Sequence, residues 1–300
     1  MISKFRIGVL VIILNFFASV AMIWGQDNPS LLQMAVPSLN IAPDARGGGM
    51  GDMGAATLPD INSQYWNAAK YAFMGSKAGV SLSYTPWLRK LVNDVALVNM
   101  TGYYKLGNSD LQAISASLRY FSLGEVNIWE NIGDVPYGLN PYEMAFDVAY
   151  SRKLSESYSM AVTLRYIRSD MGTDQNDESN AGNAFSADIS GYLEKYVLMG
   201  NAEALWSFGF NLSNIGSKIS YDGGNTNQYL PAKLTLGTGL LYPIDDYNQI
   251  GVYLDLNKYM VPYAPQKEEG ETDADYQTRV DDYKSCLLYT SPSPRDMRRS

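Results

Sequence analysis

The chain of 300 residues contains no histidine and a single cysteine, Cys286. Histidine and cysteine provide most ligands of zinc, haem and iron–sulfur clusters, and histidine is the usual base of a Ser-His-Asp triad. Sites of these kinds are therefore essentially excluded. We expect a protein without a metal, a cofactor or an enzymatic activity.

Basic residues are also few. The chain has 23 Lys and Arg against 31 Asp and Glu, a formal net charge of −8. The two terminal segments discussed below hold five of the basic residues and one of the acidic ones, which leaves −12 for the rest. A nucleic-acid partner needs a basic surface, so we expect none.

Long apolar runs are absent except at the N-terminus, where Lys4 and Arg6 precede an apolar stretch over residues 7–23. Gly25 and polar residues follow, an order typical of a secretory signal peptide, here residues 1–25. A transmembrane anchor is the alternative, but Asn15 interrupts the stretch. No other segment approaches the roughly 18 apolar residues that a spanning helix needs.

From residue 78 onward, apolar and polar residues alternate in about nine runs. Met144, Phe146 and Val148, for example, alternate with Ala145 and Asp147. A two-residue period predicts strands with one apolar face, and in lipid such a sheet must close on itself. We expect an all-β fold, a transmembrane antiparallel β-barrel over residues 78–285. Its strands are predicted at residues 79–84, 92–104, 111–121, 142–151, 158–168, 185–193, 203–213, 232–242 and 249–257.

The connections between these strands are alternately short and long, as in outer-membrane barrels, whose short turns face the periplasm. We therefore expect an integral protein of the cell outer membrane with its long loops outside. Tyrosines at strand ends suit the aromatic girdles of a barrel better than a soluble β-sandwich, the alternative fold. Nine strands cannot close a barrel with both ends in the periplasm, so we expect the natural chain to continue beyond Ser285.

The last residues, 286–300, turn abruptly basic and include Cys286. They read as a translated sequencing adapter, so we expect a non-native tail. A genuine basic tail is the alternative.

Residues 26–77 show no strand period and contain four prolines and a glycine cluster between Gly47 and Gly54. Such a stretch in a membrane protein is either disordered or packed inside the barrel, and apolar residues such as Leu39 and Trp66 favour a packed plug. The cluster lacks the Gly-Lys-Ser/Thr ending of a phosphate loop. Glycines that let a plug turn tightly against the barrel wall explain it better.

Five charged residues fall on the predicted lumen face of the strands: Arg119, Glu143, Asp147, Arg165 and Lys233. Ion pairs that hold the plug are the preferred interpretation, and a substrate-binding ladder is the alternative. Glu143 and Asp147 lie about 13 Å apart along a strand, too far for a glycosidase pair. If a three-residue turn follows Lys153, Ala145 lies opposite Arg165.

The long loops carry aromatic residues, which are frequent anchors of binding partners. The candidates are Trp87, Trp129, Tyr137, Tyr221 and Tyr229. A position at the level of the lipid headgroups is the alternative interpretation.

Several motifs resemble the PorV family of the type IX secretion system of Bacteroidetes. Residues 44–57 (DARGGGMGDMGAAT) and 65–70 (YWNAAK) resemble its N-terminal plug. Further matches lie at residues 83–89 (SYTPWLR), 102–105 (GYYK), 121–125 (FSLGE), 214–224 (NIGSKISYDGG) and 236–248 (LGTGLLYPIDDYN). The resemblance covers residues 27–285. One departure is Ala68, where relatives usually have proline.

The resemblance implies a barrel of about fourteen strands similar to the fatty-acid transporter FadL, of which about nine are present here. It places Arg46, Asp52, Trp66 and Asn67 in the plug. It also implies a role as a cargo shuttle, which binds the C-terminal signal domain of secreted proteins. The partners would be this cargo, the translocon barrel, an attachment complex with a sortase, and outer-membrane lipid.

Two other functions stay open at this stage. One is a FadL-like channel for hydrophobic small molecules, although the predicted lumen residues are mostly polar. The other is a lipid-modifying enzyme, which is disfavoured because the usual histidine base is missing.

Overall fold

The computed structural model of the protein describes residues 34–87, 94–107, 110–128, 137–172, 181–200, 202–221, 227–262, 265, 267 and 271–285. The expected signal peptide, the expected non-native tail and Trp129 lie outside the described residues.

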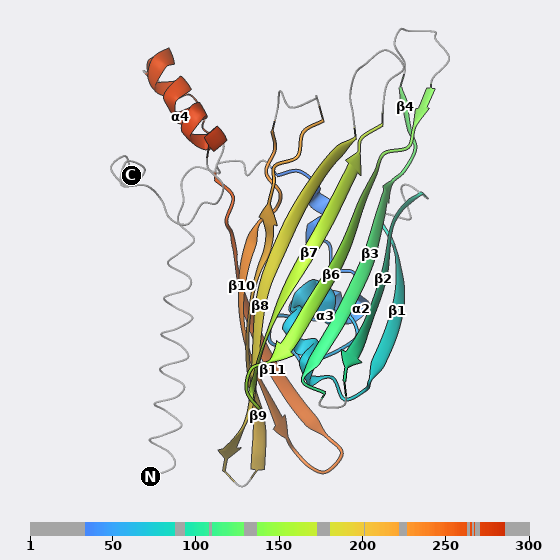
Figure 1. Ribbon diagram of the computed structural model, residues 1–300, viewed down its shortest axis with the longest axis vertical. Coiled ribbons are helices and arrows are strands. Elements are labelled where there is room, and N and C mark those ends of the chain that lie inside the picture. The colour runs from blue at the N-terminus through green and yellow to red at the C-terminus, as the bar shows by residue number, and fades with distance from the viewer. Residues whose placement is uncertain are drawn as a thin grey trace. The chain divides into compact units, whose positions relative to one another are not determined.

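Nine strands form one antiparallel sheet, and they lie side by side in chain order (Figure 1). They are β1 (Ala78–Pro86), β2 (Val95–Leu106), β3 (Gln112–Leu123), β6 (Tyr142–Lys153), β7 (Tyr158–Asp170), β8 (Gly182–Met199), β9 (Ala202–Gly216), β10 (Lys233–Pro243) and β11 (Gln249–Tyr259). All nine predicted strands are confirmed. β1 and β11 are the edges of the sheet, and no described strand joins them.

The strands between the two edges bury about every second side chain, as expected when only one face of a sheet is covered, whereas the edge strands β1 and β11 have no buried side chain. In β3, Ser115, Ser117 and Arg119 are buried, whereas Ile114 and Leu118 are exposed. We call the covered face the inner face and the opposite one the outer face. The inner face carries small, polar and charged residues, and the outer face carries apolar ones.

The connections alternate in length, so the sheet has a short-turn end and a long-connection end. One prediction about the short turns is wrong. Residues 194–202 were expected to form a loop, but β8 continues to Met199 and pairs with β9 almost to the turn at Gly200. The charged residues Glu194 and Lys195 do not interrupt the strand, because ladder pairing requires only backbone groups.

Two elements at the long-connection end were not predicted. Between β3 and β6 the chain forms a small separate hairpin of β4 (Val126–Ile128) and β5 (Tyr137–Leu139). After β11 it forms α4 (Asp273–Ser285), an acidic helix.

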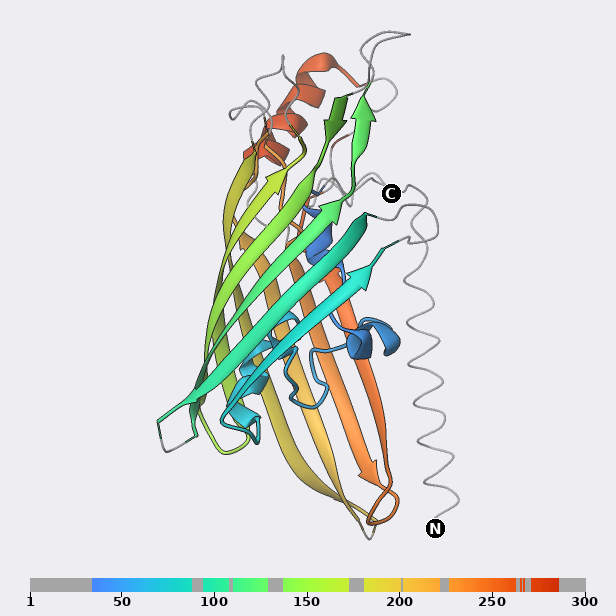
Figure 2. The same cartoon turned by 90° about the vertical axis from the view of Figure 1, so that its right-hand side faces the viewer.

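The N-terminal segment, Met34 to Ser76, contains only short helices: η2 (Pro37–Asn40), α2 (Ala45–Gly49), α3 (Ser63–Trp66) and η3 (Ala68–Phe73). It packs against the inner face, within the curve of the sheet (Figure 2). Of the helices that the structure describes, none is long and apolar enough to cross a membrane.

Candidate functional site

The contact between the N-terminal segment and the inner face brings together most of the predicted site residues. Near the long-connection end, two charged side chains of the sheet hold the backbone of Ser38. Its N–H donates to Oε2 of Glu143 over 3.1 Å, and its carbonyl accepts from Arg119 over 2.6 Å. Arg119 also donates to the carbonyl of Ile41 and lies 4.6 Å above the ring of Tyr65. Both charges are buried, which explains why each needs such partners.

In the middle of the sheet, side chains of β9 and β11 bind the backbone of the segment, and a carbonyl of β8 binds one of its side chains. One carboxylate oxygen of Asp255 accepts from the N–H groups of Gly54 and Ala55, over 2.8 and 3.0 Å. Asn211 donates to the carbonyl of Trp66 over 3.0 Å. Asn67 donates to the carbonyl of Gly191 over 2.9 Å. The segment thus completes its backbone hydrogen bonds with side chains of the sheet, as buried irregular backbone requires.

At the short-turn end, η3 and the residue after it continue these contacts. Ser159 donates to the carbonyl of Ala69 over 2.7 Å, and Lys105 donates to that of Met74 over 2.6 Å. Lys153 lies 4.1 Å above the ring of Phe73. The segment is therefore attached along the whole length of the sheet.

The glycine cluster encloses Trp66. A β-carbon at Gly47 or Gly54 would lie 2.4 or 2.2 Å from the indole ring, so both positions admit only hydrogen. Asp44 caps α2 by accepting from the N–H of Gly47 over 2.7 Å, and its other oxygen accepts from the indole N–H over 2.9 Å. The cluster therefore fits the segment's own tryptophan, whereas the prediction had it turning against the barrel wall.

Two predicted plug residues lie away from the wall contacts. Arg46 forms a partly exposed ion pair with Asp60 within the segment, at 2.7 Å. Asp52 has a left-handed backbone, φ 58°, and lines the cavity described below.

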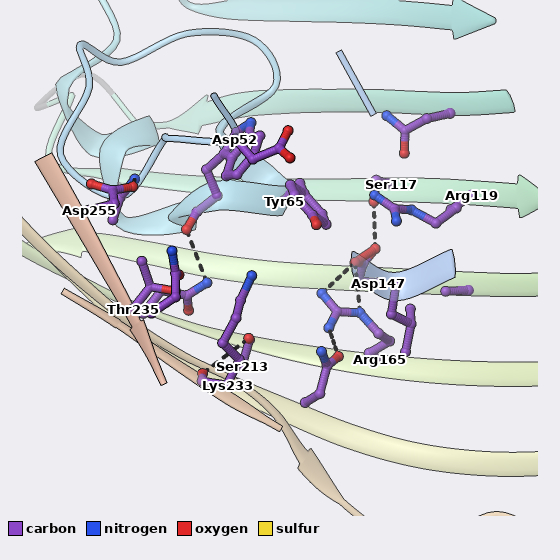
Figure 3. Close-up of a pocket in the computed structure, with 18 residues that line it drawn as sticks. Asp52, Tyr65, Ser117, Arg119, Asp147, Arg165, Ser213, Lys233, Thr235 and Asp255 are labelled. Atoms are coloured by element: carbon purple, nitrogen blue, oxygen red, sulfur yellow. Dashed lines mark hydrogen bonds and ion pairs between the residues drawn. The ribbon is translucent and has the colours of Figure 1, made fainter. Parts of the chain in front are cut away.

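A charged network on the inner face joins five strands, β3, β6, β7, β8 and β9. Figure 3 shows its members Ser117, Asp147 and Arg165. Arg165 forms ion pairs with Asp147 at 2.9 Å and with Asp188 at 2.8 Å. It also donates to the side-chain oxygen of Asn214, and Asp147 accepts from Ser117. These ion pairs lie within the sheet, so they hold strands together. Other charges of the sheet contact the segment: Arg119, Glu143, Asp255, Lys105 and Lys153.

The expected register of β6 and β7 is wrong by two residues. Asp147, not Ala145, lies opposite Arg165, because Lys153 pairs with Ser159. The turn is shifted by one residue along the chain: the N–H of Leu154 donates to the carbonyl of Tyr158, so Glu156 rather than Ser155 lies at its centre. The correction explains the ion pair, which the expected register did not place.

A narrow cavity lies between the segment and the inner face, and its lining is mostly polar (Figure 3). Asp52 and Tyr65 come from the segment, whereas Asn211, Lys233 and Thr235 come from β9 and β10. Lys233 forms no ion pair with any described residue. The described residues also contain no group of Asp or Glu that could hold a metal ion.

Lys70 is the other notable cation of this region. It is completely buried and donates to the carbonyl of Gly54 over 2.9 Å and to the hydroxyl of Thr57 over 3.1 Å. Burial lowers the pKa of Lys70 to about 8, since the charged amine is poorly solvated there.

A comparison of the sequence with models of known protein families gives a match, which includes all the site residues described above. A family model described as "Type IX secretion system protein PorV" matches residues 25–267, which is most of the chain. The chain belongs to the PorV family. No curated protein matches it. The PorV match includes the N-terminal segment and all nine strands of the large sheet, so it confirms the resemblance found in the motifs.

The predicted aromatic anchors of this PorV family member occupy different environments. Trp87 is 40 % exposed after β1. Tyr137 is the first residue of β5. Tyr221 is half-buried and donates to Ser169 over 2.9 Å. Tyr229 is buried, lies 4.3 Å beneath the Lys218 amine and contacts the ring of Tyr283.

Sequence reasoning missed four residues of the site: Lys70, Asp188, Asn214 and Asp255. Asp188 and Asp255 stand on inner-face positions of their strands, so the two-residue period could have found them. Asn214 could not be found this way, because it sits at a bulge between β8 and β9 with φ 58°. Lys70 lies in a segment without any period.

Proposed function

We propose that this protein is an outer-membrane β-barrel of type IX secretion that binds the C-terminal signal domain of secreted proteins and carries them from the translocon to the attachment complex. The family match carries the proposal. Cargo and partner proteins would meet the long connections, which face the cell exterior in such barrels.

The outer face supports a position in the membrane. Large apolar side chains on adjacent strands are strongly exposed, including Leu82 at 72 %, Leu164 at 65 %, Phe185 at 68 % and Val252 at 67 %. Such a continuous apolar surface would be unfavourable in water, at roughly 25 cal/mol for each Å². Lipid would cover it.

The edges of the sheet support a longer barrel. Among the strands that the structure describes, none pairs with the outer edge of β1 or of β11, and lipid does not tolerate such unpaired rows of backbone groups. We propose that further strands of the natural protein close a FadL-like barrel, and that residues 1–25 and 286–300 are a signal peptide and a non-native tail. Residues 26–77 then form its plug.

The cavity helps to choose between a shuttle and a channel for hydrophobic molecules. A fatty acid needs an apolar path past the plug, yet the cavity is lined by side chains such as Arg119, Arg165, Asn211 and Lys233. Hydrogen bonds from both ends and the middle of the sheet hold the segment in place. These features support a closed lumen and a function at the exposed loops.

The experiment is an affinity pull-down from outer membranes with the tagged full-length protein. Recovery of secreted proteins that share a C-terminal signal domain, together with a very large translocon barrel, is expected. A barrel recovered without them but with bound fatty acid would contradict the proposal.

Two variants locate the binding surface. Trp87→Ala removes an exposed aromatic residue from the long-connection end and should reduce cargo recovery. Tyr247→Ala is the matched control, because Tyr247 is 95 % exposed at the turn between β10 and β11 at the opposite end. Equal recovery with both variants would exclude Trp87 as an anchor.

A further inference from the structure

The first described residues of the N-terminal segment lie at the long-connection end of the sheet. Met34 forms a parallel bridge with Tyr229, and the N–H of Ala35 donates to the carbonyl of Tyr229 over 2.9 Å. Tyr229 belongs to the long connection between β9 and β10, residues 217–232. The described part of the segment therefore begins with a single β-bridge to this connection.

The next residues form a strap across this end, Met34 to Asn40. Val36 and Leu39 are buried in a cluster with Ile167, Ile219 and Leu230. Glu143 and Arg119 bind the N–H and the carbonyl of Ser38, as described above. The strap is thus fixed by apolar packing and by charge-assisted hydrogen bonds, which are stronger than neutral ones.

The backbone conformation of Val36 also shows that contacts hold the strap in place. Val36 has φ 53° and ψ 58°, a left-handed conformation that a β-branched residue rarely adopts. Such a conformation persists only where surrounding contacts outweigh its cost. Here the contacts are the apolar cluster on one side and the bond to Tyr229 on the other.

The rest of the segment leads to the opposite end. Ala69 and Met74 contact Ser159 and Lys105 near the short turns, and β1 begins there at Ala78. The segment thus runs from the long-connection end to the short-turn end, inside the curve of the sheet (Figure 2).

We infer that the exported chain enters the barrel from the cell-surface side, so that Met34 lies outside the cell and the strap closes the outer mouth of the lumen. The inference rests on the proposed outer-membrane topology, in which the long connections are extracellular. It makes the N-terminal end of the protein part of the surface that secreted partners meet, although the chain reaches the membrane from the periplasm.

The test is an epitope inserted immediately before Met34 in the full-length protein, detected by antibody on intact cells. Two reference insertions carry the same epitope, one after Tyr221 in the long connection and one between Asp246 and Tyr247 in a short turn. We expect the signals before Met34 and after Tyr221 to be unchanged by permeabilisation, and the signal at Tyr247 to require it.

The reference insertions separate the two proposals. A signal after Tyr221 on intact cells, with the one before Met34 seen only after permeabilisation, would overturn this inference and leave the topology intact. A signal at Tyr247 on intact cells, with none after Tyr221, would overturn the topology itself.

A smaller probe covers the case in which an insertion displaces the strap. Met34→Cys is made in the full-length protein and treated on intact cells with a maleimide that does not cross membranes; the unsubstituted protein is the labelling blank. Gln228→Cys and Tyr247→Cys are the references, both at exposed positions. Labelling of Met34→Cys like Gln228→Cys supports the inference; protection on intact cells that ends on permeabilisation, as for Tyr247→Cys, overturns it.

Discussion

The inner and outer faces of the same strands differ in what surrounds their side chains. In β7, Arg165 points inward, where it is buried between two aspartates, while its neighbour Leu164 points outward and is 65 % exposed. The inner face is satisfied within the chain, by ion pairs and by the N-terminal segment. No described residue covers the outer face, so its stability depends on the solvent that surrounds it. A change on one face should therefore respond to protein contacts, and a change on the other to lipid.

The largest expected effect is the loss of the inner cation. Arg165→Ala leaves the buried carboxylates of Asp147 and Asp188 without their partner, so the free energy of unfolding should fall by about 3–5 kcal/mol. Urea unfolding in lipid vesicles would measure it.

The outer face of the same strand provides the control. Arg168 donates to the Tyr142 hydroxyl at a partly exposed position, so Arg168→Ala should have a much smaller effect. Equal losses of unfolding free energy in the two variants would show that the inner network does not stabilise the protein more than a single outer hydrogen bond does.

The two faces were also predictable to different degrees. The strands could be located from the sequence because each one places apolar residues on one side with a period of two. The partners on the inner face could not, because they depend on turn length and on a bulge. A shift of the turn after Lys153 by one residue, to a centre at Glu156, places Asp147 rather than Ala145 opposite Arg165.

The N-terminal segment was the least predictable part. Its composition indicated packing, which the buried Trp66, Asn67 and Lys70 agree with. Its path could not be derived, since a chain without periodic structure takes its position from single contacts such as Ser38 with Glu143. The strap and its direction came only from the structure.

The second prediction concerns the outer face. Leu164→Arg places a charge in the middle of β7, and in a bilayer it should cost about 2–4 kcal/mol of unfolding free energy. The same change at Leu198, close to the turn at Gly200, should cost about 0–1 kcal/mol. Unfolding in lipid vesicles would measure both free energies. Similar losses at the two positions would mean that Leu198 lies as deep in the membrane as Leu164.

The third prediction returns to the inner side, where packing is tight. Gly54→Ala introduces a methyl group 2.2 Å from the ring of Trp66, and overpacking of this kind costs about 1–3 kcal/mol. Gly48→Ala is the matched control, because a β-carbon there meets nothing within 4 Å. Trp fluorescence during unfolding would follow the change. A loss at Gly48 as large as that at Gly54 would contradict the assigned role of the cluster.

The smallest expected effect is the change in the free energy of unfolding with pH that the buried amine of Lys70 causes. Burial lowers the pKa of Lys70 from 10.5 to about 8, so between these values the unfolded chain binds more protons than the folded one. The free energy of unfolding should therefore rise with pH across this window, while below about 8 the penalty for the buried charge is complete and constant.

Lys70→Met removes the titrating group, so the difference between its unfolding curve and that of the wild type should change from pH 8 to 10.5 and stay constant below. Parallel curves for the two proteins would mean that the Lys70 amine is solvated in the folded protein. That result would contradict the view that the inner side of the sheet is closed to water. Lys70 tests this view best, because its amine is held by the Gly54 carbonyl and the Thr57 hydroxyl without a carboxylate in contact.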